Sequence, residues 1–234
     1  MINFLRISNN IRLGDYLHAD GTINDVASKD VIGVCVIPSK FLPDGYARFM
    51  TLKKNVSRWG SEDRILNDNR LEGLPGKDLQ YPLSWGTSSS IISPYLPNDT
   101  LNPEFHKNLF VGNAFQDYKG YKNTQVFREK SQYYLKGENA FDSCFWISPS
   151  YRRSEWYLPA IGELALLPEK ISPINISMEK AIAVGAVGVN FPDGYCWSSS
   201  ERIKQDAWIL SIYDGYVGPF LKRNLCQIRA FLAL

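Results

Sequence analysis

The chain has 234 residues, 44% of them hydrophobic, and its 26 basic and 24 acidic residues give a net charge of +2. It is long enough to bury a substantial core and fits one large domain with a short arm. The balanced charge, without runs of Lys or Arg, gives no electrostatic case for nucleic-acid binding. No apolar stretch approaches the roughly 20 residues that cross a bilayer. Nucleic-acid binding and membrane insertion are therefore not expected.

The N-terminal region shows turns but no export signal. Met1–Ile7 lacks the charged stretch, apolar core and small-residue cleavage site of a signal peptide, so we expect synthesis in the cytoplasm. Turn residues at Gly14–Tyr16 and Asp20–Thr22 predict a short hairpin. Residues 1–27 are interpreted as an N-terminal arm or first hairpin, and residues 28–234 as the main domain.

Predicted strands are followed by predicted helices and then by further strands. The β-branched segment Val31–Ile37 predicts a strand buried on both faces, and Tyr46–Leu52 predicts its antiparallel partner. Residues 53–122 are rich in Asn, Gly, Pro and Ser, which predicts long irregular loops. Helices are expected from a cap at Asn123 or Thr124 to about Leu135, over Ala140–Phe145, from Pro159 to Pro168 and over Ser177–Val184. This order predicts an α+β fold with mostly antiparallel strands, at least two helices and long loops.

The dipeptide Asp214-Gly215 predicts a β-hairpin, because these residues tolerate the positive φ angles of a two-residue turn. Before the turn, Leu210 and Ile212 alternate with other residues, so one strand face should be buried and the other exposed. The residues assigned to the exposed face are Ile209, Ser211 and Tyr213. After the turn, Pro219 cannot donate to a central ladder, which predicts an edge or bulged strand. This position makes two apolar residues, Phe220 and Leu221, candidates for exposure, and the alternative, which is the usual one for a single apolar residue, is that they belong to the core.

Residues for catalysis and metal binding are sparse. The chain has two histidines, and its four cysteines form no Cys-x-x-Cys pair. The segments Ser88–Ser90 and Ser198–Ser200 lack a Gly-x-Ser-x-Gly elbow and are interpreted as loop serines. The sequence has no phosphate-binding loop, dinucleotide fingerprint or calcium loop. We therefore expect no enzyme activity, no cofactor and no metal site. The sequence leaves open whether Cys196 and Cys226, which flank the hairpin, form a disulfide.

Several ordered motifs in the last third of the chain resemble a known family. They are Trp156–Leu164, Trp197–Glu201, Ala207-Trp208, Asp214–Val217 and Arg229–Phe231. Within a segment of about Tyr151 to Leu234, they resemble bacterial and phage proteins with a C-type lectin fold. The resemblance is greatest to the variable proteins targeted by diversity-generating retroelements, a group that includes tropism-determinant-like receptor-binding proteins of phages. It implies a compact C-type lectin fold that displays ligand-contacting residues from the C-terminal strands and loops, about residues 196–234.

Other branches of this fold set the alternatives. Formylglycine-generating relatives use reactive cysteines, and the cysteines here form no recognisable catalytic pair in the sequence. Sugar-binding animal lectins carry Glu-Pro-Asn or Gln-Pro-Asp calcium motifs, neither of which occurs in this chain. Calcium-dependent sugar binding is therefore not implied. In a retroelement-diversified protein, Phe220 and Arg223 are permitted outcomes, whereas Trp208 and Lys222 would be fixed framework.

We therefore expect a receptor-binding protein at the tip of a phage tail fibre, which recognises a protein or glycan on a bacterial surface. The missing export signal favours a virion protein, and a bacterial cell-surface adhesin is the alternative. By analogy with tail-tip proteins, we expect a homotrimer that contacts other tail proteins. The ligand-binding residues are expected to combine Arg and aromatic anchors with adaptable polar residues. They are Arg202, Ile203, Lys204, Ile209, Ser211, Tyr213, Phe220, Leu221, Arg223, Asn224 and Leu225.

Two further functions stay open. One is a structural fibre or pilus subunit, whose C-terminal surface packs against a neighbouring chain. The other is an enzyme of the formylglycine-generating type or another hydrolase, which requires two thiols close together in a cleft or a convergent polar pocket.

Overall fold

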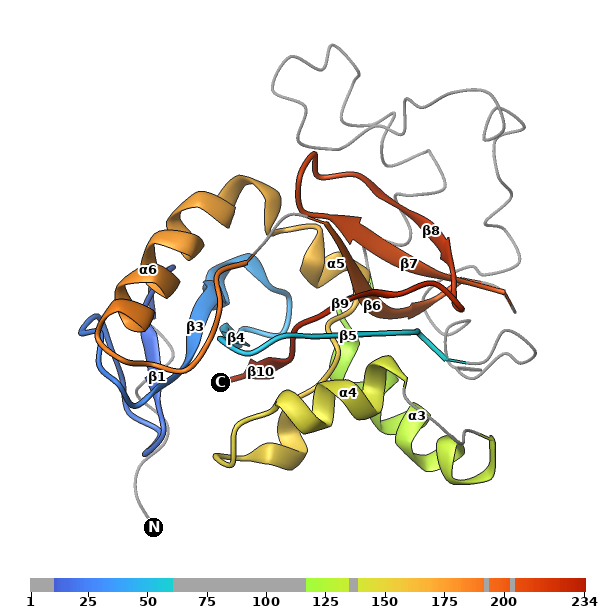
Figure 1. Ribbon diagram of the computed structural model, residues 1–234, viewed down its shortest axis with the longest axis horizontal. Helices are drawn as coiled ribbons and strands as arrows, with labels where there is room; N and C mark the ends of the chain where they lie inside the picture. Colours follow the sequence, from blue (N-terminus) through green and yellow to red (C-terminus); the bar gives the residue numbers. More distant parts are fainter. Residues whose placement is uncertain (1–10, 61–116, 135–138, 192–193, 203–204) are drawn as a thin grey trace.

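The structure is a computed structural model that describes residues 11–60, 117–134, 139–191, 194–202 and 205–234 (Figure 1). Within this part of the chain, strands form two five-stranded sheets. Sheet A, in the order β10-β4-β3-β1-β2, contains β1 (Tyr16–His18), β2 (Ile23–Asn24), β3 (Val31–Ile37), β4 (Arg48–Thr51) and β10 (Phe231–Ala233). Sheet B, in the order β5-β9-β6-β7-β8, contains β5 (Asn55–Ser57), β6 (Tyr195–Glu201), β7 (Asp206–Ser211), β8 (Val217–Leu221) and β9 (Cys226–Ile228).

Helices cover the two sheets. The α-helices are α3 (Gly120–Tyr134), α4 (Ala140–Ile147), α5 (Ile161–Leu164) and α6 (Ile171–Ala183). The 3-10 helices are η3 (Ser39–Phe41), η6 (Arg153–Glu155) and η7 (Pro168–Lys170). In Figure 1, α6 lies beside sheet A on the left, whereas α3 and α4 lie below sheet B, against which they pack. The architecture is α+β and C-type-lectin-like, as expected. No helix in the described residues has the length and apolar character that crossing a membrane requires.

Sheet A follows the sequence prediction. β3 is buried at every residue except Ile32, and β4 pairs with it antiparallel, with Val34 opposite Met50. The N-terminal hairpin is also confirmed, because β1 pairs antiparallel with β2. Since β1 pairs with β3 as well, the hairpin is continuous with the sheet. The division of the chain after residue 27 stays a prediction.

Helix α3 begins before its predicted cap. The expected cap residues, Asn123 and Thr124, lie inside the helix, so the predicted start is wrong. Asn123 Nδ2 donates to Asp117 Oδ2 at 3.1 Å, and Thr124 Oγ1 accepts the N–H of Leu158 at 3.0 Å. These side chains stabilise contacts with neighbouring segments, which the sequence pattern does not distinguish from capping.

The other predicted helices exist with shifted ends. α4 agrees with the prediction, and its N-cap is Asn139, whose Oδ1 accepts the N–H groups of Phe141 and Asp142. α5 spans only Ile161–Leu164, so the predicted helix from Pro159 to Pro168 is wrong in extent. α6 begins at Ile171, before the predicted start at Ser177. Most of the long predicted loop region, residues 61–116, lies outside the described residues.

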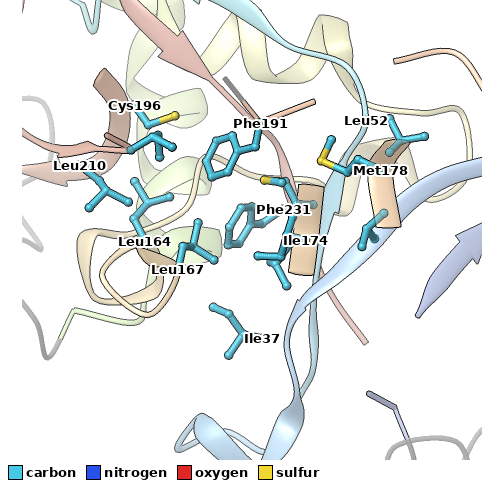
Figure 2. Packing of buried hydrophobic residues seen from close by; sticks show 14 of the residues in the cluster. Ile37, Leu52, Leu164, Leu167, Ile174, Met178, Phe191, Cys196, Leu210 and Phe231 are labelled. Carbon is cyan, nitrogen blue, oxygen red and sulfur yellow. The ribbon is translucent and has the colours of Figure 1, made fainter. Parts of the chain in front are cut away.

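Each sheet lies between two clusters of buried hydrophobic residues. One cluster contains Val34 and Leu210, and the other contains their chain neighbours Cys35 and Ile209. Adjacent residues of a strand point to opposite faces. Figure 2 shows part of the first cluster, where Ile174 and Met178 of α6 lie close to Phe231 of sheet A, with Leu210 of sheet B on the other side. Both faces of the central strands are therefore buried.

A buried charge cluster joins sheet A to α5. Arg48 Nε donates to Glu163 Oε1 at 2.6 Å, and the Tyr157 hydroxyl donates to the same oxygen at 2.7 Å. The N–H of Ala160 donates to Glu163 Oε2 at 2.8 Å. The pKa of the Glu163 carboxyl lies above its ordinary value because the group is buried. The charge of Arg48 and these hydrogen bonds oppose this rise. Arg48 and Glu163 are both buried away from water, so the charge of each is stabilised by the other.

Arg229, from the Arg-Ala-Phe motif, links sheet A to the segment before β6. Its guanidinium is buried and donates to the carbonyls of Leu52 at 2.8 Å, Val189 at 3.1 Å and Asn190 at 2.5 Å. Burial lowers the pKa of Arg229 to about 10. Five donors in a rigid fork suit several carbonyls at once, which the single ammonium of Lys does not.

We predict unequal effects of removing the two carboxylates that contact Arg48. Glu163→Gln removes the fully buried charge, so it should lower the free energy of unfolding by about 3 kcal/mol. Asp44→Asn is the control, because Asp44 is 41% exposed and its ion pair with Arg48 should contribute about 1 kcal/mol or less. Urea unfolding of the three proteins measures the difference. Equal losses for the two variants would contradict the role given to Glu163.

Candidate ligand-binding surface

The β7–β8 hairpin is confirmed, with a longer turn than predicted. The strands pair antiparallel from Asp206 opposite Leu221 to Leu210 opposite Val217. The N–H of Ser211 donates to the carbonyl of Tyr216 at 2.7 Å, so residues 212–215 form the connection instead of the predicted two. Gly215 has φ +71°, the left-handed conformation that favours glycine. Cross-strand neighbours in this ladder lie on the same face.

Two residues predicted to be exposed on β7 are buried, and that expectation is wrong. Ile209 is 1% and Ser211 4% exposed. β7 lies between β6 and β8 in sheet B, so it has neighbours on both sides. Its Ile209 face belongs to one hydrophobic cluster and its Leu210 face to the other. Alternation identified the two faces correctly but did not show that both are covered.

Aromatic side chains from the neighbouring strands cover Ile209. The ring centroids of Tyr195 (β6) and Phe220 (β8) lie 5.4 Å apart, and those of Trp197 (β6) and Phe220 lie 6.0 Å apart. β6 and β8 flank β7 and are separated by about twice the 4.8 Å spacing of adjacent strands, so these rings meet over β7. Tyr216 also lies on this face. We call Tyr195, Trp197, Tyr216 and Phe220 the aromatic roof.

Gly218 makes room for this arrangement. A Cβ atom at Gly218 would lie 2.2 Å from the Tyr216 hydroxyl oxygen, so the tyrosine ring occupies the space that a side chain would fill. The sequence prediction assigned ligand contact to Phe220, which stays a prediction, and did not single out its neighbours Tyr195 and Tyr216. Tyr195 and Trp197 are two residues apart in β6, so they lie on the same face of the strand. This spacing, combined with the register of the hairpin, could have identified Tyr195.

The remaining predicted ligand-binding residues divide into exposed and partly buried groups. Tyr213 is 80% and Leu225 66% exposed, and Arg223 is also exposed. The half-buried residues are Phe220, Leu221, Asn224 and Arg202. Arg202 Nη1 donates to Asp206 Oδ2 at 2.6 Å, an ion pair that holds it against β7. Ile203 and Lys204 lie outside the described residues. Five of the predicted residues lie in the edge strand β8 or in the connections on either side of it. We call these residues the C-terminal rim: Tyr213, Phe220, Leu221, Arg223 and Leu225.

Buried polar contacts fix the strands beneath this surface. Ser198–Ser200, predicted as loop serines, lie buried in β6, so that prediction is wrong. The Ser200 hydroxyl donates to Asp117 Oδ2 at 2.5 Å, which ties β6 to the segment before α3. Lys222, predicted as framework, is fully buried. Its ammonium donates to Glu201 and lies 4.7 Å from the ring centroid of Trp59.

Proline interrupts the outer edge of sheet B. The hydrogen bonds from Ser211 N to Tyr216 O and from Lys222 N to Gln205 O fix the alternation of the hairpin. Residues 216, 218, 220 and 222 therefore turn their backbone groups towards β7, and residues 217, 219 and 221 turn theirs outwards. Pro219 has no N–H and stands at the middle outward position, where a strand from another chain would need a donor.

The four cysteines are free and buried. Burial raises the pKa of the Cys144, Cys196 and Cys226 thiols to about 12. Reactive cysteines have the opposite character, exposure with a lowered pKa. Cys196 and Cys226 belong to different hydrophobic clusters and form no disulfide. In the described part of the chain, no group of three or more His, Cys, Asp or Glu residues is arranged to hold a metal ion.

Comparison with known proteins supports the fold. No family model matches the chain. No curated protein matches it. Among solved structures, the chain is similar to a fimbrial protein from Bacteroides ovatus ATCC 8483, with a TM-score of 0.58 and 18% sequence identity. The match covers 96% of this chain and 49% of the other, so the chain spans about half the length of that protein. This likeness concerns the fold and does not address diversification by a retroelement.

We predict that Pro219 prevents pairing between chains at the β8 edge. Pro219→Val supplies an outward N–H and a residue that favours strands, so it should cause concentration-dependent self-association. Sedimentation velocity over a range of protein concentrations measures this. Pro43→Val, at an exposed proline in a turn, is the matched control and should sediment like the unmodified protein. Identical behaviour of both variants would show that β8 is protected by something other than Pro219.

Proposed function

We propose that this chain is an adhesion subunit of a surface fibre and recognises a molecule on a bacterial surface through the C-terminal rim. The observation that carries the proposal is the exposure of Tyr213 and Leu225 on either side of a fixed edge strand. Tyr213 and the exposed Arg223 are of residue types that are enriched in binding hot spots, and Leu225 adds exposed apolar surface beside them. The fimbrial name of the structural neighbour supports a fibre protein.

Rigidity beneath the rim supports recognition. Strand β7 is buried on both faces, and Lys222, next to Arg223, is held by Glu201. A surface mounted on such a framework loses little conformational entropy on binding. Because Pro219 disrupts backbone pairing at this edge, contacts with another molecule are made here by side chains. We propose that the chain binds its ligand without catalysing a reaction. The burial of its four cysteine thiols supports this proposal.

The kind of fibre is a finer proposal. Resemblance of the C-terminal motifs to retroelement-targeted variable proteins supports a phage tail fibre, with the protein in the virion. The fimbrial neighbour supports a fibre on a bacterial surface. Both assemblies require the same exposed rim, so one attachment experiment applies to both. The expected homotrimer remains a proposal, and sedimentation equilibrium of the purified chain measures it.

We predict that replacing three rim residues weakens attachment to cells. The variant Tyr213→Ala, Arg223→Ala, Leu225→Ala should retain the unfolding midpoint of the unmodified protein, because the side chains are exposed. Loss of one or two hot spots should lower affinity at least about tenfold. Flow cytometry with labelled protein on a panel of bacterial strains measures attachment.

The control for this experiment has matched chemistry elsewhere on the surface. Tyr46→Ala, Lys180→Ala, Val187→Ala removes an aromatic, a basic and an apolar side chain that are exposed outside the rim. It should bind like the unmodified protein. Equal attachment by the rim variant, with its folding intact, would place the binding surface elsewhere.

A second function, that of a structural fibre subunit, is favoured by Trp146. Its indole is 73% exposed at the C-terminal end of α4, beside Phe145, whose ring lies 5.5 Å from the guanidinium carbon of Arg128. Figure 1 places this end of α4 on the opposite side of the molecule from β8. A neighbouring subunit of the fibre could dock there without covering the rim.

We predict that Trp146→Ala separates assembly from recognition. Tryptophan is enriched among interface hot spots, whose truncation costs about 2 kcal/mol or more, so the variant should incorporate poorly into fibres. The purified single chain should still attach to cells, because the rim is unchanged. Immunogold counting of fibres measures incorporation. Normal incorporation would remove Trp146 from the subunit interface.

A further inference from the structure

The aromatic roof combines exposure with a fixed geometry. Trp197, its buried member, is held by a hydrogen bond from Nε1 to the carbonyl of Ser57 at 3.0 Å. Phe220 packs against Trp197 and Tyr195, and Tyr216 fills the space over Gly218. The members lie on strands or next to one, and not on long loops. Their rings are therefore positioned before any ligand arrives.

The exposed area of the roof fits a small ligand. Tyr195 is 45% exposed, and Phe220 and Tyr216 are half-buried. Since a whole aromatic side chain offers about 150–250 Å², the three rings together expose on the order of 200 Å². A stable protein interface buries about 800 Å² on each partner. The roof alone matches one or two ring-sized units better than a protein partner.

The roof carries two phenol hydroxyls, those of Tyr195 and Tyr216. Burial raises the pKa of the Tyr216 phenol, and neighbouring Tyr195 and Asp214 raise it further, so this hydroxyl keeps its proton at neutral pH. A protonated phenol both donates and accepts hydrogen bonds. No member of the roof is charged. The roof therefore presents apolar ring faces bordered by hydroxyl groups, which complements a ligand that has apolar C–H faces and hydroxyl edges.

We propose that the aromatic roof is a metal-independent binding site for a neutral glycan, in which a sugar ring stacks on Tyr195 and Phe220 and its hydroxyls bond the tyrosine phenols. Pyranose rings have this combination of an apolar face and a hydroxylated edge, and C–H groups interact favourably with aromatic faces. The inference rests on the proposed adhesion function and names its ligand class. The C-terminal rim then contacts the rest of the surface molecule.

Affinity electrophoresis tests the site directly. The full chain is run in native gels containing a mannan, a dextran or a galactan. Retardation by at least one polysaccharide is expected, with binding weakened about tenfold in Tyr195→Ala and in Phe220→Ala, the cost of one stacking contact. Tyr195→Phe and Phe220→Tyr keep a ring and should retain most of the retardation. Phe41→Ala, at an exposed phenylalanine in η3, is the control that should change nothing. Urea midpoints establish that each variant is folded.

Attachment to cells before and after mild periodate oxidation separates the inference from the proposed function. Loss of attachment after periodate and in the Tyr195→Ala variant supports both. If attachment survives periodate and no polysaccharide retards the protein, the proposed glycan site is overturned and the proposed adhesion function is retained. Attachment that periodate abolishes but that both roof variants retain also overturns the roof as the site. If a polysaccharide retards the protein but no strain binds it, only the adhesion function is overturned. If there is neither retardation nor attachment, both the glycan site and the adhesion function are overturned.

Discussion

The buried carboxylate of Glu163 is the contact on which the arrangement of the two sheets depends. It accepts from Arg48 on β4, from the Tyr157 hydroxyl and from the backbone of its own helix, α5. Tyr157 also exchanges both backbone hydrogen bonds with Phe231 on β10, at 2.9 Å each. One carboxylate thus connects β4, the C-terminal strand β10 and helix α5, which packs against β6 and β7 of sheet B. A charge this deeply buried is tolerated only with such a complete set of partners.

Every sheet edge in the described part of the chain is shielded in a different way. β2 has two residues, and the free side of β10 is bridged by Tyr157. α4 packs against β5, with the N–H of Ala140 near the carbonyl of Trp59 at 3.4 Å. β8 carries Pro219 at its outward middle position. Unshielded edges invite pairing between chains, so these edges indicate that contacts with other molecules use side chains.

The sequence predicted local structure well where a residue choice has a local cause. Val31–Ile37 is a strand because β-branched residues favour one, and Gly215 marks a turn because it adopts a positive φ angle. Burial was harder to predict, because it depends on neighbours that are distant in sequence. Ile209 alternates correctly but is covered by rings from β6 and β8. Similarly, Asn123 has the residue type of a cap and instead bonds Asp117. Of the predicted ligand-binding residues, Tyr213, Arg223 and Leu225 are exposed, as the prediction requires, and their role in binding stays a prediction.

Stability and recognition are assigned to different residues in the C-terminal region. Trp208, Lys222 and Arg229 are buried, and substitution there removes packing or leaves a partner unsatisfied. Tyr213 and Leu225 project from the connections around β8 and are largely exposed, so their replacement changes the surface at little cost in folding. The two groups lie close together in the sequence, because buried strands and exposed connections follow one another in this part of the chain. A scaffold of this kind tolerates substitutions at Tyr213, Arg223 and Leu225, since these exposed residues hold little of the fold together.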